Sequence, residues 1–260
     1  GTYPEPTVLI SRALNRDRRL WERMPSNKDF LDIRLGTGTV PSMINIQKPK
    51  DRFTMRDDNL MGELKDIGNN FDGVSGMPIA FSMMGNNMLG MIGNRKTTID
   101  TAMASIVHIS ALHSYDEVKI VCVYNAEESH KWEWVKQLPH VWAPEKALRF
   151  VASSRDEVRD VFLYLKEVLS DRDETKDNGY DKQVMHLPHF LVYIADPELV
   201  EDELVMKYLT NPNKQLGVST IFIYDKLNQL PKECKAFIQC EETESSLYNR
   251  DKPETGLIKF

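Results

Sequence analysis

Eight consecutive residues in the first half of the chain nearly match the phosphate-binding P-loop pattern G-x-x-x-x-G-K-[ST]. They are Gly90, Met91, Ile92, Gly93, Asn94, Arg95, Lys96 and Thr97. In a working P-loop the glycines let backbone N–H groups converge on the β-phosphate, the lysine bridges the β- and γ-phosphates, and the hydroxyl holds Mg²⁺. Lys96 and Thr97 have the required residue types. The chemistry that this pattern suggests is binding of ATP with Mg²⁺.

One position departs from the pattern. Arg95 stands where the last glycine belongs, and it adds a Cβ atom and a long cationic side chain where backbone and phosphates approach most closely. Arg95 either fills the pocket and blocks phosphate, so that Arg95→Gly would raise ATP affinity, or it clamps the phosphates. In the second case the same change would weaken binding by roughly 1.5–3 kcal/mol. We favour blockage, because no side chain can replace a close backbone approach.

A P-loop must follow a buried strand and open a helix. Residues 78–84 form an apolar run suited to the strand, and Ile99, Met103 and Ile106 recur near helical spacing after the loop. We therefore expect residues 90–97 to join the carboxyl end of a central strand to a helix that begins at about Thr98.

Hydrolysis of a nucleoside triphosphate needs an acidic residue at the end of a neighbouring strand to hold Mg²⁺, often followed by a glutamate that activates water. The expected strand at 189–195 is followed by Asp196, Pro197 and Glu198. If Asp196 is the metal ligand, Pro197 stands where the glutamate belongs. If the motif is shifted by one residue, Ala195 stands at the metal position and Asp196 at the position of the base. Glu198 supplies a base only if the proline turn returns it to the site. We favour Asp196 as a helix N-cap with Pro197 at the first helical position.

The rest of the chain alternates between apolar runs and amphipathic segments. We expect strands at 30–35, 40–46, 117–124, 148–152, 189–195 and 218–224, edge strands at 237–240 and 256–260, and helices at 59–67, 131–138, 156–169 and 199–209. Residues 170–183 carry almost no apolar side chains and are expected to form a mobile loop. Apolar strands separated by helices predict an α/β fold with a mostly parallel sheet and helices on both faces.

The N-terminal part has a different pattern. Residues 8–24 are expected to form a helix with a basic face that ends before Pro25. That face suits lipid head groups or an acidic partner, but a solvated face with the apolar side packed on the domain is the interpretation we favour. We predict an N-terminal linker helix with appended strands over residues 1–50 and an ATPase-type domain over residues 51–260.

The composition limits the function classes. The 260 residues carry a net charge of −6 with a pI of about 5.6. This argues against a nucleic-acid partner, because proteins that bind nucleic acid usually present a surface with clustered Lys and Arg side chains. No apolar run approaches the roughly 20 residues that span a bilayer. His186 and His189 flank a proline, so they do not share a helix face and no metal site is expected there. The chain begins without methionine and ends on a strand-like run, as a cut fragment would.

Four local strings resemble one family along nearly the whole chain. They are RLWER at 19–23, FLDIRLGTG at 30–38, ALHSYDEVKI at 111–120 and WEWVKQLPH at 132–140. They resemble the membrane-proximal cytoplasmic domain of the FtsK/SpoIIIE-type ATPases of type VII secretion systems, called EssC or YukB in Firmicutes and EccC in actinobacteria. The resemblance implies a RecA-like fold with degenerate nucleotide motifs, and Arg95 and the residues around Asp196 are the departures that place catalysis in doubt.

The resemblance also implies a place in a larger assembly. This piece would lie at the cytoplasmic face of the bacterial membrane, between paired transmembrane helices and a string of ATPase domains of the same chain. Its partners would be those domains, the transmembrane stalk, other membrane components of the secretion system and other copies of itself.

Two functions compete. The first is a non-hydrolysing ATPase-like module that couples the membrane stalk to downstream motor domains in protein export. The second is a nucleotide-binding regulatory or weakly hydrolysing domain in which ATP and Mg²⁺ are still held. The candidate nucleotide-binding residues are Gly90, Gly93, Asn94, Arg95, Lys96, Thr97, Thr98 and Asp196, and no catalytic residue is assigned. A DNA pump, by analogy with FtsK, is disfavoured by the acidic charge balance.

Overall fold

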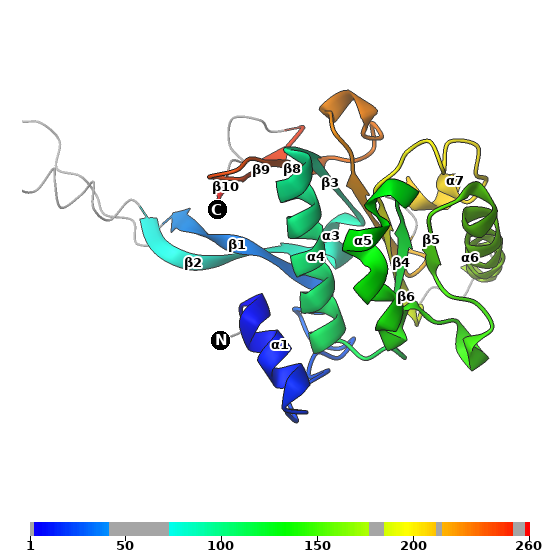
Figure 1. Ribbon diagram of the computed structural model, residues 1–260, viewed down its shortest axis with the longest axis horizontal. Coiled ribbons are helices and arrows are strands. Elements are labelled where there is room, and N and C mark those ends of the chain that lie inside the picture. The colour runs from blue at the N-terminus through cyan, green and yellow to red at the C-terminus, as the bar shows by residue number, and fades with distance from the viewer. Residues whose placement is uncertain (1–2, 42–72, 177–184, 212–214, 252–257) are drawn as a thin grey trace, which may run out of the picture.

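The computed structural model describes residues 3–41, 73–176, 185–211, 215–251 and 258–260 (Figure 1). The strands are β1 (Asp32–Pro41), β2 (Gly73–Ser82), β3 (Met88–Gly93), β4 (Val118–Val123), β5 (Val151–Ala152), β6 (His189–Ile194), β7 (Val218–Ile223), β8 (Ala236–Cys240), β9 (Ser246–Asn249) and β10 (Ile258–Lys259). The α-helices are α1 (Pro6–Leu14), α3 (Met83–Asn86), α4 (Arg95–Leu112), α5 (Ser129–Trp132), α6 (Arg155–Lys176) and α7 (Met206–Leu209). The expected helix at 59–67, and the expected strand at 40–46 from residue 42 onward, lie outside the described residues.

The main sheet has the strand order β10-β9-β8-β3-β7-β6-β4-β5. β8, β3, β7, β6, β4 and β5 run parallel, and β9 and β10 extend one edge antiparallel. β3 pairs with β7 on one side and with β8 on the other. After β3 the chain forms β4, β5, β6 and β7 on one side of it and then crosses to form β8 on the other side. Open α/β sheets bind ligands at such a switch point, beyond the carboxyl ends of the strands.

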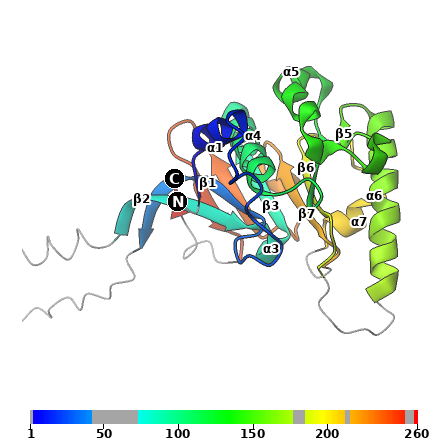
Figure 2. The same cartoon turned by 90° about the horizontal axis from the view of Figure 1, so that it is seen from below.

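Apolar side chains fill both faces of this sheet. In β4, Ile120 and Cys122 belong to one buried cluster and Val121 and Val123 to a second, because successive side chains of a strand point to opposite faces. α4 packs on the first face and α6 on the second, and Figure 2 shows the sheet between them. The predicted α/β fold, with a mostly parallel sheet and helices on both faces, is confirmed.

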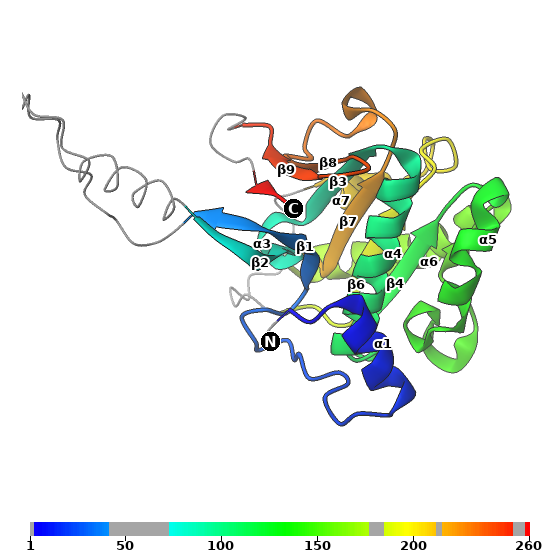
Figure 3. The same ribbon diagram turned by 60° about the vertical axis from the view of Figure 1, so that its left-hand side comes forward.

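β1 and β2 form a separate two-stranded antiparallel sheet (Figure 3). β2 contains residues 78–82, which we expected to lead into the P-loop, so this part of the prediction is wrong. Phe81 of β2 pairs with Ile33 of β1, and both side chains are buried in the cluster on the α4 face. An apolar run can pack from a flanking ribbon as well as from a central strand, and its composition does not distinguish the two. The predicted boundary at residue 50 lies outside the described residues and stays a prediction.

The predicted helix over residues 8–24 is wrong after Leu14, where α1 ends. Asn15 follows as the C-cap, and Arg16 adopts a left-handed backbone with φ 48°. The side chain of Asp17 then accepts a hydrogen bond from the backbone N–H of Arg19 at 2.9 Å. Such side-chain to backbone bonds compete with helical ones, so the chain turns although its apolar spacing still fits a helix.

Three expectations in the second half are corrected. α6 continues to Lys176 instead of ending near residue 169, and residues 177–184 of the expected loop lie outside the described residues. Arg172 holds this helical extension, because its guanidinium donates to the carbonyls of Leu216 at 2.8 Å and Pro188 at 3.0 Å. The expected helix at 199–209 is reduced to α7, and β8 is an inner strand between β3 and β9, not an edge.

Candidate functional site

The P-loop-like residues lie at the carboxyl end of β3, where the strand passes directly into α4. Gly90 and Gly93 belong to the strand, and the helix begins at Arg95, not at about Thr98. Only Asn94 separates the two elements. The strand-to-helix junction is therefore present as expected, but no loop of several residues lies there to wrap a phosphate group.

The two glycines allow close packing between strands. A Cβ atom on Gly90 would lie 2.4 Å from Cδ1 of Leu230. Gly93 has φ +109°, and a Cβ atom there would lie 2.4 Å from the carbonyl oxygen of Cys240, at the end of the neighbouring β8. Gly93 needs glycine because its backbone conformation and the carbonyl of Cys240 leave no room for a Cβ atom, and at Gly90 a Cβ atom would displace the end of the Leu230 side chain. The glycine spacing therefore has an explanation without phosphate.

Three backbone N–H groups at this junction, those of Gly93, Asn94 and Thr97, already have acceptors within the protein. Gly93 donates to the carbonyl of Asp225 at 3.4 Å, and Asn94 donates to the carbonyl of Cys240 at 2.8 Å. Asn94 is the N-cap of α4, and its Oδ1 accepts from the N–H of Thr97 at 3.0 Å. A P-loop leaves such groups free to converge on phosphate, and here they bond within the protein.

The hydroxyl and ammonium groups of the pattern also have partners of their own. The Thr97 hydroxyl donates to Oδ1 of Asn94 at 3.2 Å, and the Thr98 hydroxyl donates to the carbonyl of Asn94 at 2.7 Å. Lys96 points along the outside of α4 and pairs with Asp100 at 2.6 Å, with 84% of its side chain exposed. The structure thus places Lys96 away from the cleft in which the nucleotide of a P-loop protein would lie.

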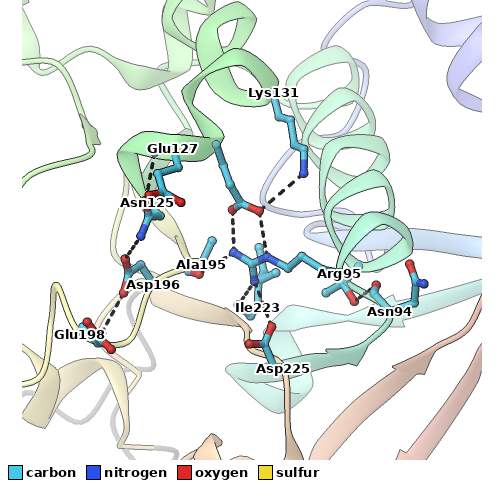
Figure 4. A network of polar contacts seen from close by, with 12 residues as sticks. Asn94, Arg95, Asn125, Glu127, Lys131, Ala195, Asp196, Glu198, Ile223 and Asp225 are labelled. Carbon is cyan, nitrogen blue, oxygen red and sulfur yellow. Dashed lines mark hydrogen bonds and ion pairs between the residues drawn. The ribbon is translucent and has the colours of Figure 1, made fainter.

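Arg95 occupies that cleft instead (Figure 4). Its Nε and Nη2 atoms donate to the two carboxylate oxygens of Glu128 at 3.0 and 2.6 Å, a bidentate ion pair. Nη1 donates to the carbonyl of Ile223 at 3.0 Å and Nη2 to the carbonyl of Ala195 at 2.9 Å. The guanidinium therefore ties the start of α4 to the carboxyl ends of β6 and β7 and to the 3₁₀ turn Ala126–Glu128 after β4.

The cleft around Arg95 has a volume of about 600 Å³ and is acidic. Five carboxylates line it: Glu127, Glu128, Asp196, Glu198 and Asp225. Burial raises the pKa of Glu128, but the hydrogen bonds and charge of Arg95, helped by Lys131, outweigh burial and hold this pKa below its usual value. Glu128 therefore remains an anion at neutral pH, and the one arginine in the cleft is already paired with it.

Asp196 lies in the same cleft as Arg95 but has a local structural role. Its Oδ2 accepts from the side-chain amide of Asn125 at 3.1 Å, and its Oδ1 accepts from the N–H of Glu198 at 2.9 Å. Pro197 turns the chain so that Glu198 also lines the cleft. The expected helix N-cap is wrong, because residues 197–202 form turns and Asp196 closes a turn of two residues instead.

The sequence prediction missed Glu128, Asn125 and Asp225. Asn125 and Glu128 follow β4 within five residues, and Asp225 follows β7 within two. The carboxyl ends of parallel strands meet at one edge of the sheet, so polar residues directly after buried strands are the signal that could have indicated them. Their pairing with Arg95 depends on the strand order and could not have been derived from the chain alone.

The residues at the β3–α4 junction and in the cleft around Arg95 do not fit a nucleoside triphosphate with Mg²⁺. The junction has one linking residue, its N–H groups at Gly93, Asn94 and Thr97 are already bonded, and Lys96 points elsewhere. The carboxylates around Arg95 would repel phosphates. The arginine and Glu128 together fill the place where phosphates would be expected.

The fold defines the class of this domain: a RecA-like α/β domain with the fold of P-loop ATPases. Two solved structures share its fold. EccC of Thermomonospora curvata (ATPases 2 and 3), in complex with a signal sequence peptide, superposes with a TM-score of 0.59 at 12% identity, covering 94% of this chain and 45% of that one. EssC of Geobacillus thermodenitrificans (ATPases 2 and 3) gives 0.56 at 9% identity, over 93% and 46%.

Sequence comparison leads from the class to the family. The ESX secretion system protein EccC of Geobacillus thermodenitrificans is 25% identical over 91% of this chain. YukB of Bacillus subtilis is 27% identical over 85%, and the type VII secretion protein EssC of Staphylococcus aureus is 24% identical over 99%. The predicted resemblance is confirmed: the chain is a homologue of the EccC, YukB and EssC proteins of type VII secretion.

The chain corresponds to a small part of these relatives. It spans 16% of the Geobacillus EccC, 15% of YukB and 18% of EssC. No model of a known protein family matches it. Within the residues that the structure describes, no helix is both long and apolar enough to cross a membrane.

Proposed function

We propose that this chain is a non-hydrolysing, ATPase-like module of a type VII secretion motor. In this role it couples the transmembrane stalk to the downstream ATPase domains at the cytoplasmic face of the membrane. Its partners are those domains, the stalk and other membrane components of the system, with self-association in the full assembly and no nucleic acid. Homology to EccC, YukB and EssC supports the secretion role.

The observation that carries the non-hydrolysing part is the position of Arg95. Its guanidinium makes a bidentate pair with Glu128 and bonds the carbonyls of Ala195 and Ile223, so it links four segments at the edge where motor domains hold nucleotide. A fold can persist after its chemistry is lost. With the cleft cross-linked by the protein's own side chain, the module transmits force as a rigid body and does not change with nucleotide state.

Isothermal titration of ATP–Mg²⁺ into the chain tests this proposal. The wild type should give no binding heat, with a Kd weaker than about 1 mM, equivalent to less than about 4 kcal/mol. Lys96→Ala should be indistinguishable from it, because Lys96 pairs with Asp100 outside the cleft. Arg159→Ala, which removes an arginine from an exposed ion pair on α6, is a matched control for charge.

Two outcomes would favour the alternative, a nucleotide-binding regulatory or weakly hydrolysing domain. The first is micromolar binding by the wild type that Lys96→Ala abolishes, because Lys96 would then have to swing into the cleft. The second is weaker binding after Arg95→Gly, which would make Arg95 a phosphate clamp. We expect Arg95→Gly/Glu128→Gln to raise affinity more than Arg95→Gly alone, because the single change leaves Glu128 unpaired and repulsive to phosphate.

A further inference from the structure

The segment from Val8 to Lys28 exposes an unusual amount of apolar surface. Val8, Ile10, Leu14, Trp21 and Met24 have between 41% and 80% of their surface exposed. They are five of the thirteen large apolar residues exposed among the described part of the chain, within a stretch of 17 positions. Single exposed apolar residues are ordinary, whereas a concentration of them indicates an interaction surface.

α1 is firmly attached through its other side. Leu9 is fully buried against Ala111 and Leu112 at the end of α4, and Arg12 is buried with it. Ile10 and Leu14, four positions apart, share a face of the helix that is not part of this contact. The exposed apolar face therefore does not arise from a loosely placed helix, and nothing in the described residues covers it.

The same segment carries cations for which the described residues provide no ion pair. Its two carboxylates and the flanking Glu5 and Asp29 are all engaged: Glu5 with Arg34, Asp17 with Arg19, Glu22 with Arg12 and Asp29 with Arg23. Arg16, Arg18 and Lys28 are exposed, and within the described residues no ion pair is formed by any of them. The segment thus has an uncompensated positive charge in a chain whose net charge is −6.

We propose that this N-terminal surface, formed by Ile10, Leu14, Trp21 and Met24 with Arg16, Arg18 and Lys28, binds the surface of an anionic lipid bilayer. Apolar side chains next to unpaired cations match a bilayer, which offers lipid phosphates and acyl chains within a few ångströms of each other. A soluble partner that offers only acidic groups would satisfy the charges but would leave the exposed apolar side chains in water. The inference goes beyond the coupling role and does not depend on what the cleft binds.

The position of this surface gives the domain an orientation. The N–H of Trp21 donates to the carbonyl of Ala111 and that of Arg23 to the carbonyl of Leu112, at the last turn of α4. Arg95 is the first residue of the same helix, and 18 residues of α-helix extend about 27 Å. Figures 1 and 3 show α1 at one end of α4 and the carboxyl edge of the sheet at the other. A domain docked through α1 therefore turns its cleft away from the bilayer.

Co-sedimentation of the whole chain with vesicles tests the proposal. Vesicles of mixed phosphatidylglycerol and phosphatidylcholine should pellet the chain, and vesicles of phosphatidylcholine alone should not. Binding should weaken as salt is added, because exposed charges are screened. Arg16→Gln/Arg18→Gln should lower the partition coefficient roughly 25-fold, at about fivefold per cation. Ile10→Ser/Leu14→Ser should lower it at unchanged charge.

Two control pairs lie on exposed positions away from this surface. Arg155→Gln/Arg159→Gln on α6 makes the same change in net charge, and Leu163→Ser/Leu204→Ser makes the same change in apolar surface. Both should bind vesicles like the wild type. The proposal would be overturned if the control variants lost as much vesicle binding as the variants of the N-terminal surface, or if the wild type did not pellet with anionic vesicles. Salt-sensitive binding to polyglutamate without binding to vesicles would assign the surface to an acidic protein instead. Circular dichroism confirms that each variant is folded.

Discussion

At the scale of single residues, Arg95 makes the junction of β3 and α4 part of an internal cross-link. An arginine can hold a carboxylate through two parallel hydrogen bonds, a geometry that lysine lacks. Glu128 provides that carboxylate, and the carbonyls of Ala195 and Ile223 accept from two further donors of the guanidinium. Because the side chain of Glu128 is only 16% exposed, water screens this pair less than a surface pair.

Removing the cross-link should cost stability. We expect Arg95→Ala to lower the free energy of unfolding by about 1–3 kcal/mol, because Glu128 and two carbonyls lose their donor. Arg95→Lys should recover part of the loss, since it restores charge but not the bidentate geometry. Arg159→Ala, from an exposed pair, should change stability by less than about 0.5 kcal/mol. Urea denaturation measures all three, and equal effects of Arg95→Ala and Arg159→Ala would contradict the cross-link.

The Arg95–Glu128 pair also predicts a pH dependence. The pKa of Glu128 is lower in the folded protein than in the unfolded chain, so the pair stabilises the fold above the unfolded pKa and loses this effect as the pH falls through the folded pKa. The stability difference between wild type and Glu128→Gln should be largest near neutral pH and should narrow below about pH 4. Urea denaturation at successive pH values measures it. A difference that stays constant into acid would show that the carboxylate charge is not involved.

At the scale of elements, the junction of β3 and α4 depends on how closely β3 and β8 approach. Asn94 caps α4 and also donates its backbone N–H to the carbonyl of Cys240 at the end of β8. Gly93 directly precedes it and faces the same carbonyl. The short junction is thus held by the neighbouring parallel strand, and no bound anion is needed to order it.

Gly93→Ala should therefore be strongly destabilising. The new Cβ atom would lie 2.4 Å from the carbonyl oxygen of Cys240, on a backbone with φ +109° that other residues rarely adopt. We expect a loss of roughly 2–4 kcal/mol in the free energy of unfolding. Gly85→Ala in α3 is the matched control, because nothing lies within 4 Å of its added Cβ, and it should be neutral or slightly stabilising. Thermal or urea unfolding of both variants measures the contrast, and a harmless Gly93→Ala would mean that the strands can separate.

At the scale of the whole molecule, the domain keeps the fold of a P-loop ATPase domain while the Arg95–Glu128 pair spans its cleft. The switch point beside β3, the helix α4 and the acidic turns after β4, β6 and β7 all meet at one edge. At the opposite end of α4, α1 and the following turns present an apolar and basic surface. An acidic cleft at one end of α4 and a basic, apolar surface at the other agree with the proposed role as a connector between a membrane and a motor.

Such a connector should not turn over ATP. We expect phosphate release by the chain at the background rate, because no lysine lines the described cleft and no group of three or more His, Cys, Asp or Glu side chains in the described residues is placed to hold a metal ion. The loss of both effects is worth several kcal/mol of barrier. A steady-state phosphate assay with the wild type and Lys96→Ala measures this. Turnover near 1 s⁻¹, an ordinary enzyme rate, that disappears in Lys96→Ala would overturn the non-hydrolysing assignment.

The sequence alone determined the alternation of buried strands with amphipathic helices, the strand-to-helix junction near Lys96, and the resemblance to type VII secretion ATPases. These features depend on local periodicity or on contiguous strings. The tertiary structure decided which strand precedes α4, because residues 78–82 and 88–93 are both apolar and only strand pairing separates them. It also decided that Arg95 faces Glu128 while Lys96 faces solvent. Arg95 and Glu128 are 33 positions apart in the sequence and meet only because the parallel strands align their carboxyl ends. That alignment depends on the packing of the whole sheet.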